Sequence, residues 1–289
     1  MPLNVNFNFT PNSRKAEPRT LIMVSDGDTP QIQQPVRAVS CDTPEKAAYA
    51  GTPPKAQAKL NLCRDRLENG FFNAIPQSLR TYIVQKIKAD AAERHIGAAL
   101  RASEKFTLVL EQRLTKPDGS KRKLAIIPTG EIIDVYGRLL AYFAPWYANT
   151  ANDPLPPKGS PQRDTFNLNM IANGWAAFFP VYPSLPKDDD FNIAIAAAVD
   201  AWDRKLGQWA EFGSDLLLGY EYRMCIKLAT NDGSAADELI AKAFQRVCVD
   251  LRTKKILGKF GFGDIPPPYR LWVWENDLLK AKEDLGLIE

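Results

Sequence analysis

The sequence from residue 34 to residue 45 reads QPVRAVSCDTPE, and it places three charged side chains on and just after one predicted strand. Residues 35–41 are mostly apolar and include two valines, which favours a strand. The next four residues are typical of an ordinary helix start. Arg37 lies five residues before Asp42, and an odd offset along a strand reverses the face. If both side chains meet at one site, the chain must bend or bulge between them.

Two further fragments carry residues of the same chemical kinds. Residues 20–24 predict a strand that ends at an Asp-Gly turn, and Asp28 follows that turn. Residues 134–138 read DVYGR and predict a turn that presents Tyr136 and Arg138. Each fragment alone is typical of a surface turn. Together they offer carboxylates, which bind hard divalent cations, and arginines, which hold phosphate. A metal ion with two guanidiniums would stabilise the charge of a phosphodiester transition state.

The composition sets limits on fold and chemistry. With 289 residues, of which 45% are hydrophobic, the chain can bury one large or two modest cores. The net charge of +3 does not by itself indicate a nucleic-acid-binding protein. The single histidine, His95, excludes mechanisms that need two histidines. The four cysteines lack the close pairs of a zinc site; burial as small apolar residues is favoured, and a disulfide stays open.

No targeting or membrane signal is found in the sequence. The first 15 residues are polar and rich in asparagine, unlike a signal peptide. No run approaches the ~20 apolar residues that a membrane-spanning helix requires. We therefore expect a soluble protein of the cytoplasm or another intracellular compartment, without a membrane partner.

Helical periodicity is strongest in the first half of the chain. A helix is predicted from residue 54 to about residue 69, and a second helical segment from residue 76 to about residue 102. Their apolar stripes are Ala56, Leu60, Cys63 and Leu67, and then Leu79, Ile83, Ile87 and Ala91. His95 continues the second stripe, so we interpret it as a packing residue rather than a metal ligand or an acid–base group.

The remainder of the chain alternates predicted strands, loops and helices. We expect a strand over 106–114, an antiparallel meander up to residue 143, and helices over 167–173 and 188–206. Beyond residue 209 we expect a strand around 216–226, a helix over about 234–253 and a last helix over 275–285.

These fragments, in this order, resemble the staphylococcal-type thermonuclease family. The matching stretches are 17–29, 34–45, 134–143 and 167–209, and the resemblance covers roughly 18–69, 106–146 and 166–208. It implies an α+β fold, with a five-stranded OB-like β-barrel and packed helices. The implied parts are an N-terminal lead at 1–17, a thermonuclease-like domain at 18–209 with insertions at about 71–105, 115–130 and 147–165, and a mainly helical C-terminal extension at 210–289.

The resemblance also implies a function, a metal and a set of site residues. The expected protein is a calcium-dependent nuclease that hydrolyses DNA and RNA with low sequence specificity and leaves 3′-phosphate ends. Its implied groups are the calcium ligands Asp28, Asp42 and the Thr43 carbonyl, the catalytic Arg37, Glu45 and Arg138, and the substrate-binding Tyr136 and Tyr182. Glu45 would orient or deprotonate the attacking water, and the two arginines would hold the phosphate.

The sequence departs from the family pattern at two places, and two alternatives stay open. The segment between Asp28 and Arg37 is short and contains Pro30, and Pro180 stands where a second pocket tyrosine is expected. One alternative is a non-catalytic nucleic-acid or protein binding module on the same fold. Another is an active nuclease that the extension directs to a protein partner.

Overall fold

The chain folds as a mixed α+β protein whose strands lie in open sheets. The computed structural model describes residues 18–289, so the predicted N-terminal lead at 1–17 lies outside the described residues. The strands are β1 (Leu21–Asp26), β2 (Thr29–Ile32), β3 (Val36–Ala38), β4 (Ser40–Asp42), β5 (Leu124–Ile133), β6 (Leu139–Pro145), β7 (Ala177–Phe179), β8 (Val181–Tyr182), β9 (Arg246–Asp250), β10 (Lys255–Gly258) and β11 (Arg270–Trp274).

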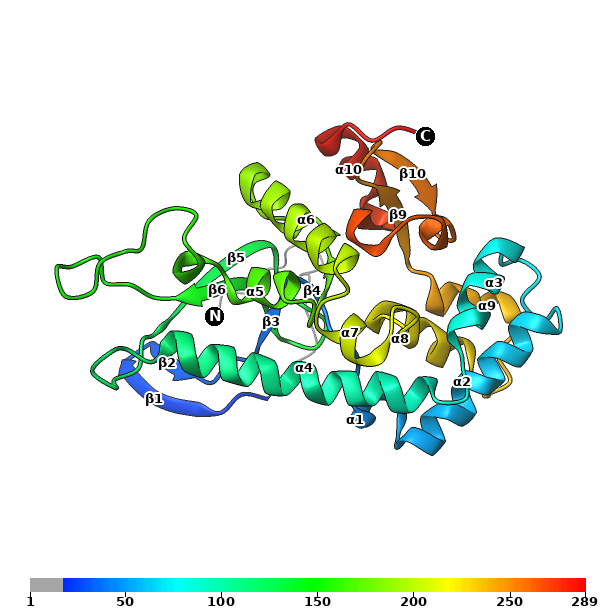
Figure 1. The fold of residues 1–289 in the computed structure, drawn as a ribbon, viewed down its shortest axis with the longest axis horizontal. Helices are drawn as coiled ribbons and strands as arrows, with labels where there is room; N and C mark the ends of the chain where they lie inside the picture. Colours follow the sequence, from blue (N-terminus) through cyan, green and yellow to red (C-terminus); the bar gives the residue numbers. More distant parts are fainter. Residues whose placement is uncertain (1–17) are drawn as a thin grey trace, which may run out of the picture.

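Helices surround these sheets and form one end of the molecule (Figure 1). They are α1 (Ala47–Ala50), α2 (Pro53–Glu68), α3 (Gln77–Lys86), α4 (Ala91–Leu114), α5 (Phe166–Ala172), α6 (Asp188–Asp203), α7 (Gln208–Phe212), α8 (Gly219–Leu228), α9 (Ala236–Ala243) and α10 (Leu278–Leu285). Four short 3₁₀ segments are η1 (Pro161–Arg163), η2 (Gly261–Asp264), η3 (Pro267–Tyr269) and η4 (Glu275–Asp277). The long helix α4 runs from the helical end to the sheet of β5 and β6 (Figure 1).

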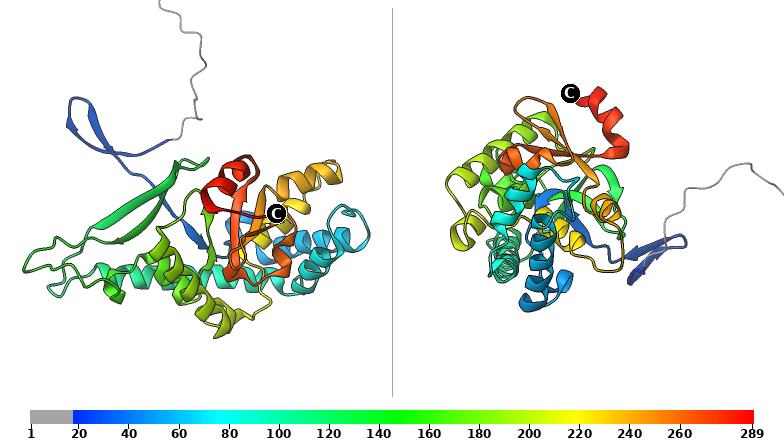
Figure 2. Two further views of the ribbon diagram at one scale, coloured as in Figure 1. Left: turned by 90° about the horizontal axis from the view of Figure 1, so that it is seen from above. Right: turned by 90° about the vertical axis from the view of Figure 1, so that its right-hand side faces the viewer.

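In the described part of the chain the strands pair in four separate sets. β3 lies parallel to β6, and β6 lies antiparallel to β5; β4 pairs antiparallel with β7. A second sheet has the order β10-β9-β11-β8. The hairpin of β1 and β2 is exposed along its whole length and projects from the body in both views of Figure 2. Within residues 18–289 the strands therefore form open sheets, and a closed five-stranded barrel is not seen.

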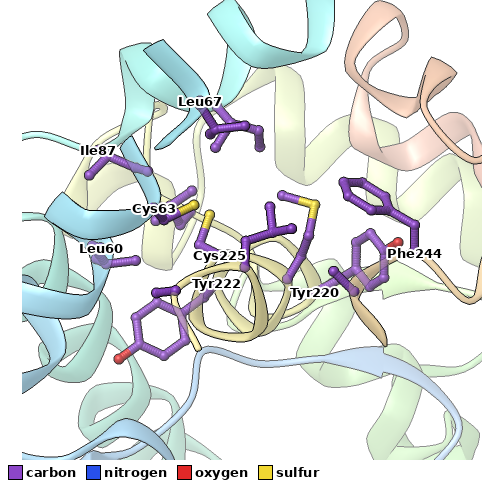
Figure 3. Close-up of a cluster of buried hydrophobic side chains, with 14 of the residues drawn as sticks. Leu60, Cys63, Leu67, Ile87, Tyr220, Tyr222, Cys225 and Phe244 are labelled. Carbon is purple, nitrogen blue, oxygen red and sulfur yellow. The ribbon is translucent and has the colours of Figure 1, made fainter. Parts of the chain in front are cut away.

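The largest hydrophobic core joins α2, α3 and α4 to α8 and α9. The predicted stripe on α2 is confirmed, because all four of its residues are buried. Figure 3 shows α8 at the centre of this core, with Cys63 of α2 and Cys225 of α8 facing each other. All four cysteines are free thiols. Segments from both halves of the chain thus share one core, so the region beyond residue 209 packs directly against helices from the first half.

A buried ion cluster crosses this core. The Glu221 carboxylate on α8 accepts hydrogen bonds from Lys86 at 2.7 Å, Arg270 at 3.0 Å and the Tyr82 hydroxyl at 2.6 Å. Burial raises the pKa of Glu221, but the neighbouring Lys86 and Arg270 outweigh it and bring the pKa down to about 2. The ionised carboxylate therefore ties α8 to α3 and β11.

Three predicted elements are wrong in type or extent. Residues 106–114 belong to α4, because Ala102 and Phe106 continue an i, i+4 spacing that packs against a second core cluster. Residues 219–228 form α8, with Tyr220, Met224 and Leu228 buried at the same spacing. The predicted helix over 234–253 ends at residue 243, because residues 246–250 pair as β9 in the middle of a sheet.

The helices over 54–69 and 275–285 are found close to their predicted positions. So are those at 167–173 and 188–206, whereas the segment from residue 76 divides into α3 and α4. Within residues 18–289 no helix combines the length and the apolarity that crossing a membrane would need.

The Glu221 cluster generates a stability prediction. Replacing Glu221 by Gln leaves Lys86 and Arg270 buried without their counter-charge, so we expect a loss of about 3–5 kcal/mol in the free energy of unfolding. The stabilisation by the ionised carboxylate is full above pH 4.5 and is lost as the pH falls towards 2, since the folded-state pKa is depressed. Urea unfolding followed by circular dichroism measures both effects.

The matched control is Glu238→Gln on the exposed face of α9, where we expect a change of no more than about 0.5 kcal/mol. An E221Q protein as stable as the control would contradict this interpretation of the cluster.

Candidate active site

A pocket of about 260 Å³ brings together several of the predicted site residues. It is lined by Arg37 of β3, by Thr43 and Glu45 in the segment after β4, and by Arg138 in the turn immediately before β6. Its walls also include apolar side chains of α4 and α5, among them Phe106 and Phe166. The two arginines and the glutamate that the sequence predicted as one catalytic set therefore face a common cavity.

The bend required between Arg37 and Asp42 is present. Val39 forms a turn between β3 and β4, and Ser40 has a φ of 58°, in the left-handed region that non-glycine residues seldom adopt. The buried Asn167 of α5 holds this bend: its amide nitrogen donates to the Val39 carbonyl at 2.9 Å, and its amide oxygen accepts from the Phe143 backbone at 3.1 Å. The bend lets Arg37 line the pocket while Asp42 points into the interior.

Arg37 is the most available cation of the pocket. Its guanidinium is half-buried, and among the described residues it has no hydrogen-bonding or ion-pair partner. Burial lowers its pKa; the nearby Arg223 and Arg138 act in the same direction, and the Asp42 and Glu45 carboxylates oppose them. A half-buried guanidinium with unused donors is suited to bind an oxyanion.

Arg138 is held in place by its own turn. Its Nε and Nη2 donate to Asp134 Oδ2 at 2.8 and 2.6 Å, and the other oxygen of Asp134 accepts the backbone N–H groups of Tyr136 and Arg138. The guanidinium also lies 5.1 Å from the centre of the Tyr136 ring. Tyr136 is 70% exposed, so its ring is open to contact from solution.

Glu45 is positioned by a fully buried histidine. The Glu45 backbone N–H donates to His95 Nε2 at 2.8 Å, and His95 Nδ1–H donates to the Leu217 carbonyl at 2.9 Å. The imidazole stacks on Tyr222 with a centroid distance of 3.8 Å. Burial lowers the pKa of His95 to about 3, so the ring stays neutral in the folded protein. His95 is thus a packing residue, as its place on the helical stripe predicted, and it also anchors the Glu45 backbone, which was not predicted.

Asp42 is engaged by α8, in the region beyond residue 209. It is 1% exposed; Oδ1 accepts from Arg223 Nη2 at 2.7 Å, and Oδ2 accepts from the Tyr220 backbone N–H at 2.6 Å. A second nitrogen of the same guanidinium, Nη1, donates to Glu45 Oε1 at 2.6 Å. The carboxylates Asp42 and Glu45 therefore share one arginine that the sequence analysis did not identify.

The three expected calcium ligands do not form one site: Asp42 and the Thr43 carbonyl both lie beside Gly219, but Asp28 does not join them. Asp28 lies in the exposed turn between β1 and β2, where it accepts a hydrogen bond from the Thr29 hydroxyl at 3.0 Å. Calcium takes about 6–8 oxygens, and both oxygens of Asp42 are already hydrogen-bonded. In the described part of the chain, no three acidic, histidine or cysteine residues are grouped as metal ligands would be. The residues in this arrangement do not fit the ion.

Tyr182 is also placed away from the pocket. It is 6% exposed and packs in a cluster with Val249, Leu271 and Val273, and its hydroxyl donates to Asp284 of α10. The expectation that Tyr182 binds substrate does not agree with this position, because the ring is part of the packing between β8, β11 and α10. Of the two predicted substrate-binding tyrosines, Tyr136 alone lies next to a pocket arginine.

Comparison with known proteins adds no relative: no protein-family model matches the chain, and no similar protein is found among curated proteins. The interpretation of the pocket therefore depends on its residues and geometry.

The sequence did not predict the roles of three important residues. Arg223 lies in a segment with no motif, Asn167 lies at an ordinary helix start, and His95 was assigned to packing without its bond to Glu45.

The neutral His95 makes a pH prediction. Its folded pKa of about 3 is below its ordinary 6.5, so the unfolded chain binds the extra proton first. The contribution of neutral His95 to the free energy of unfolding is therefore complete above pH 6.5. Below pH 6.5 this contribution falls, by up to about 1.4 kcal/mol per pH unit. In His95→Gln the amide can keep both hydrogen bonds but does not titrate, so its stability should fall less steeply between pH 6.5 and 5.

Urea titrations of both proteins across this pH range measure the difference, and the single histidine of the chain makes it attributable. If the free energy of unfolding depended on pH with the same slope in both proteins, His95 would have to be protonated in the folded protein, contrary to this interpretation.

Proposed function

We propose that this pocket binds a phosphate of DNA or RNA and hydrolyses its phosphodiester bond. The observation that carries the proposal is the convergence of Arg37, Arg138 and Glu45 on one cavity of about 260 Å³. A water occupies about 30 Å³, so a phosphate group and an attacking water fit together in this space. Two guanidiniums next to a carboxylate supply anion binding and proton transfer, the two things that phosphodiester hydrolysis demands.

The proposed step uses the free oxygen of Glu45. Oε1 is bonded to Arg223, and Oε2 has no hydrogen-bond partner among the described residues. A water oxygen forms a bond to phosphorus while its proton passes to Oε2. The bond from phosphorus to the 5′ oxygen breaks, and this oxygen takes up a proton from solvent. Arg37 and Arg138 stabilise the charge that collects on the non-bridging oxygens. The products are a 3′-phosphate and a 5′-hydroxyl.

Other parts of the thermonuclease resemblance belong to the same proposal. The parallel pair β3–β6, the antiparallel strand β5 and the pair β4–β7 would correspond to an OB-like barrel in an open form. The exposed ring of Tyr136 would stack on a base and give little sequence preference. Calcium does not enter the proposed step, because its expected ligands are dispersed or engaged.

A non-catalytic binding module is the second candidate, and one observation favours it. The ion pair between Arg223 and Glu45 occupies one oxygen of the proposed base at 2.6 Å. If that ion pair prevents Glu45 from accepting a proton, the pocket would hold a nucleic-acid phosphate without cleaving it. Binding with no turnover in any buffer would identify this case.

The proposal predicts that Arg37→Ala lowers kcat/KM by about 10²–10³-fold, because it removes donors aimed at the transition state. Glu45→Gln should lower kcat by a similar factor while substrate still binds. Initial rates with a fluorescein-labelled single-stranded DNA, together with end-group analysis of the products, measure both changes.

Arg204→Ala is the matched control. Arg204 is exposed at the end of α6 and, among residues 18–289, forms an ion pair with Asp200 alone, so this variant should cleave at the parent rate. Near-parent rates for the folded R37A or E45Q proteins would refute the assignment.

A further inference from the structure

Arg223 connects the proposed site to the region that the resemblance does not cover. It lies on α8, 181 residues along the chain from Asp42 and 178 from Glu45. Its two terminal nitrogens bridge these carboxylates at 2.7 and 2.6 Å, and its side chain is 20% exposed. Burial lowers the pKa of Arg223, but the two carboxylates outweigh this effect, so the guanidinium stays charged. One fixed positive charge thus sits between the two acidic groups.

The first turn of α8 packs closely against Asp42 and the Thr43 carbonyl. The Tyr220 N–H donates to Asp42 Oδ2 at 2.6 Å. A Cβ atom at Gly219 would lie 2.8 Å from the same oxygen and closer still to the Thr43 carbonyl oxygen. Only glycine allows the helix to approach so closely. The Thr43 carbonyl, which was expected to bind calcium, therefore faces the backbone of α8.

We infer that Arg223 is the resident counter-cation of the Asp42–Glu45 pair and that the site acts on phosphodiesters without a divalent cation. The second of these claims, that the site acts on phosphodiesters without a divalent cation, rests on the proposed function. In this arrangement Arg223 offsets one of the two negative charges and holds Glu45 so that Oε2 faces the attacking water. Arg223 is a positioning residue, and the contact with the substrate phosphate is left to Arg37 and Arg138.

The alternative is that a divalent cation binds between the acids after α8 withdraws. That change would break two ion pairs and the Tyr220 bond to Asp42, and it would leave the Asp42 carboxylate, 1% exposed, without those partners. Breaking one buried pair costs about 3–5 kcal/mol. A cation would have to recover this energy without Asp28, which lies in the turn between β1 and β2; this hairpin projects from the body (Figure 2).

The first experiment needs no variant. Calcium chloride is titrated into the full-length protein in a calorimeter, and cleavage of the labelled DNA is measured with excess EDTA and with millimolar calcium. We expect no saturable heat of binding and a rate that EDTA changes less than twofold. A saturable heat that Glu45→Gln abolishes, or cleavage that EDTA stops and calcium restores, would overturn the inference.

The second experiment tests the role of Arg223 directly. Arg223→Gln should lower kcat by about tenfold or more with little change in KM, because it disturbs the base rather than the phosphate contacts. Arg223→Lys keeps the charge and should recover part of kcat. Lys227→Gln, one turn further along α8, is the control and should behave as the parent. An unchanged kcat in a folded R223Q protein would overturn the inference.

The two proposals fail in different ways. If no condition gives cleavage and the parent protein does not bind the labelled DNA, the proposed function is wrong, and the calorimetric titration still decides whether a divalent cation binds. If cleavage occurs but requires calcium, the proposed function stands and the inference about Arg223 is wrong.

Discussion

The contact between Asp42 and the first turn of α8 is the constraint on which the site depends. A carboxylate that is 1% exposed is costly to bury unless its charge is matched and its oxygens are hydrogen-bonded. Arg223 and the Tyr220 backbone supply both requirements. Because these partners come from α8, the region beyond residue 209 helps to fix the segment that carries Asp42 and Glu45, together with β7, Asn167 and His95.

The same helix is fixed on its opposite side. Successive helical residues are about 100° apart, so Glu221 and Arg223 point in nearly opposite directions from α8. Glu221 is bound to Lys86 and Arg270 inside the core, while Arg223 is bound to the acids at the pocket. α8 therefore links the packing of the core to the geometry of the site. Loss of the ion pairs at either cluster should shift α8 and so disturb the ion pairs at the other.

Helical periodicity was informative where an element buries one regular stripe. The stripe on α2 is found as predicted, since Ala56, Leu60, Cys63 and Leu67 are all buried. Short apolar runs were ambiguous between helix and strand, as at residues 106–114 and 216–226, because their packing partners decide the outcome. The site residues likewise fall into those that the sequence predicts and those that it does not. Arg37, Glu45 and Arg138 come from local motifs and meet at the pocket, whereas the contacts of Arg223 join residues nearly 180 positions apart, for which a single sequence holds no signal.

The charges around the pocket explain why one arginine has a special place. Within the described residues, Arg223 faces Asp42 and Glu45, and Arg138 is paired with Asp134. Arg37 has no such pair, and neither has Arg246, whose guanidinium interacts electrostatically with Arg37, Arg223 and Asp42. Four guanidiniums therefore stand against three carboxylates, and an incoming phosphodiester brings its negative charge to a region with one positive charge in excess. Its binding also depends on geometry, that is, on the unused donors of Arg37 in a half-buried setting where each hydrogen bond is stronger than in water. A guanidinium does not acidify a bound water as a metal ion does, so the proton of the attacking water has to be taken by Glu45 alone.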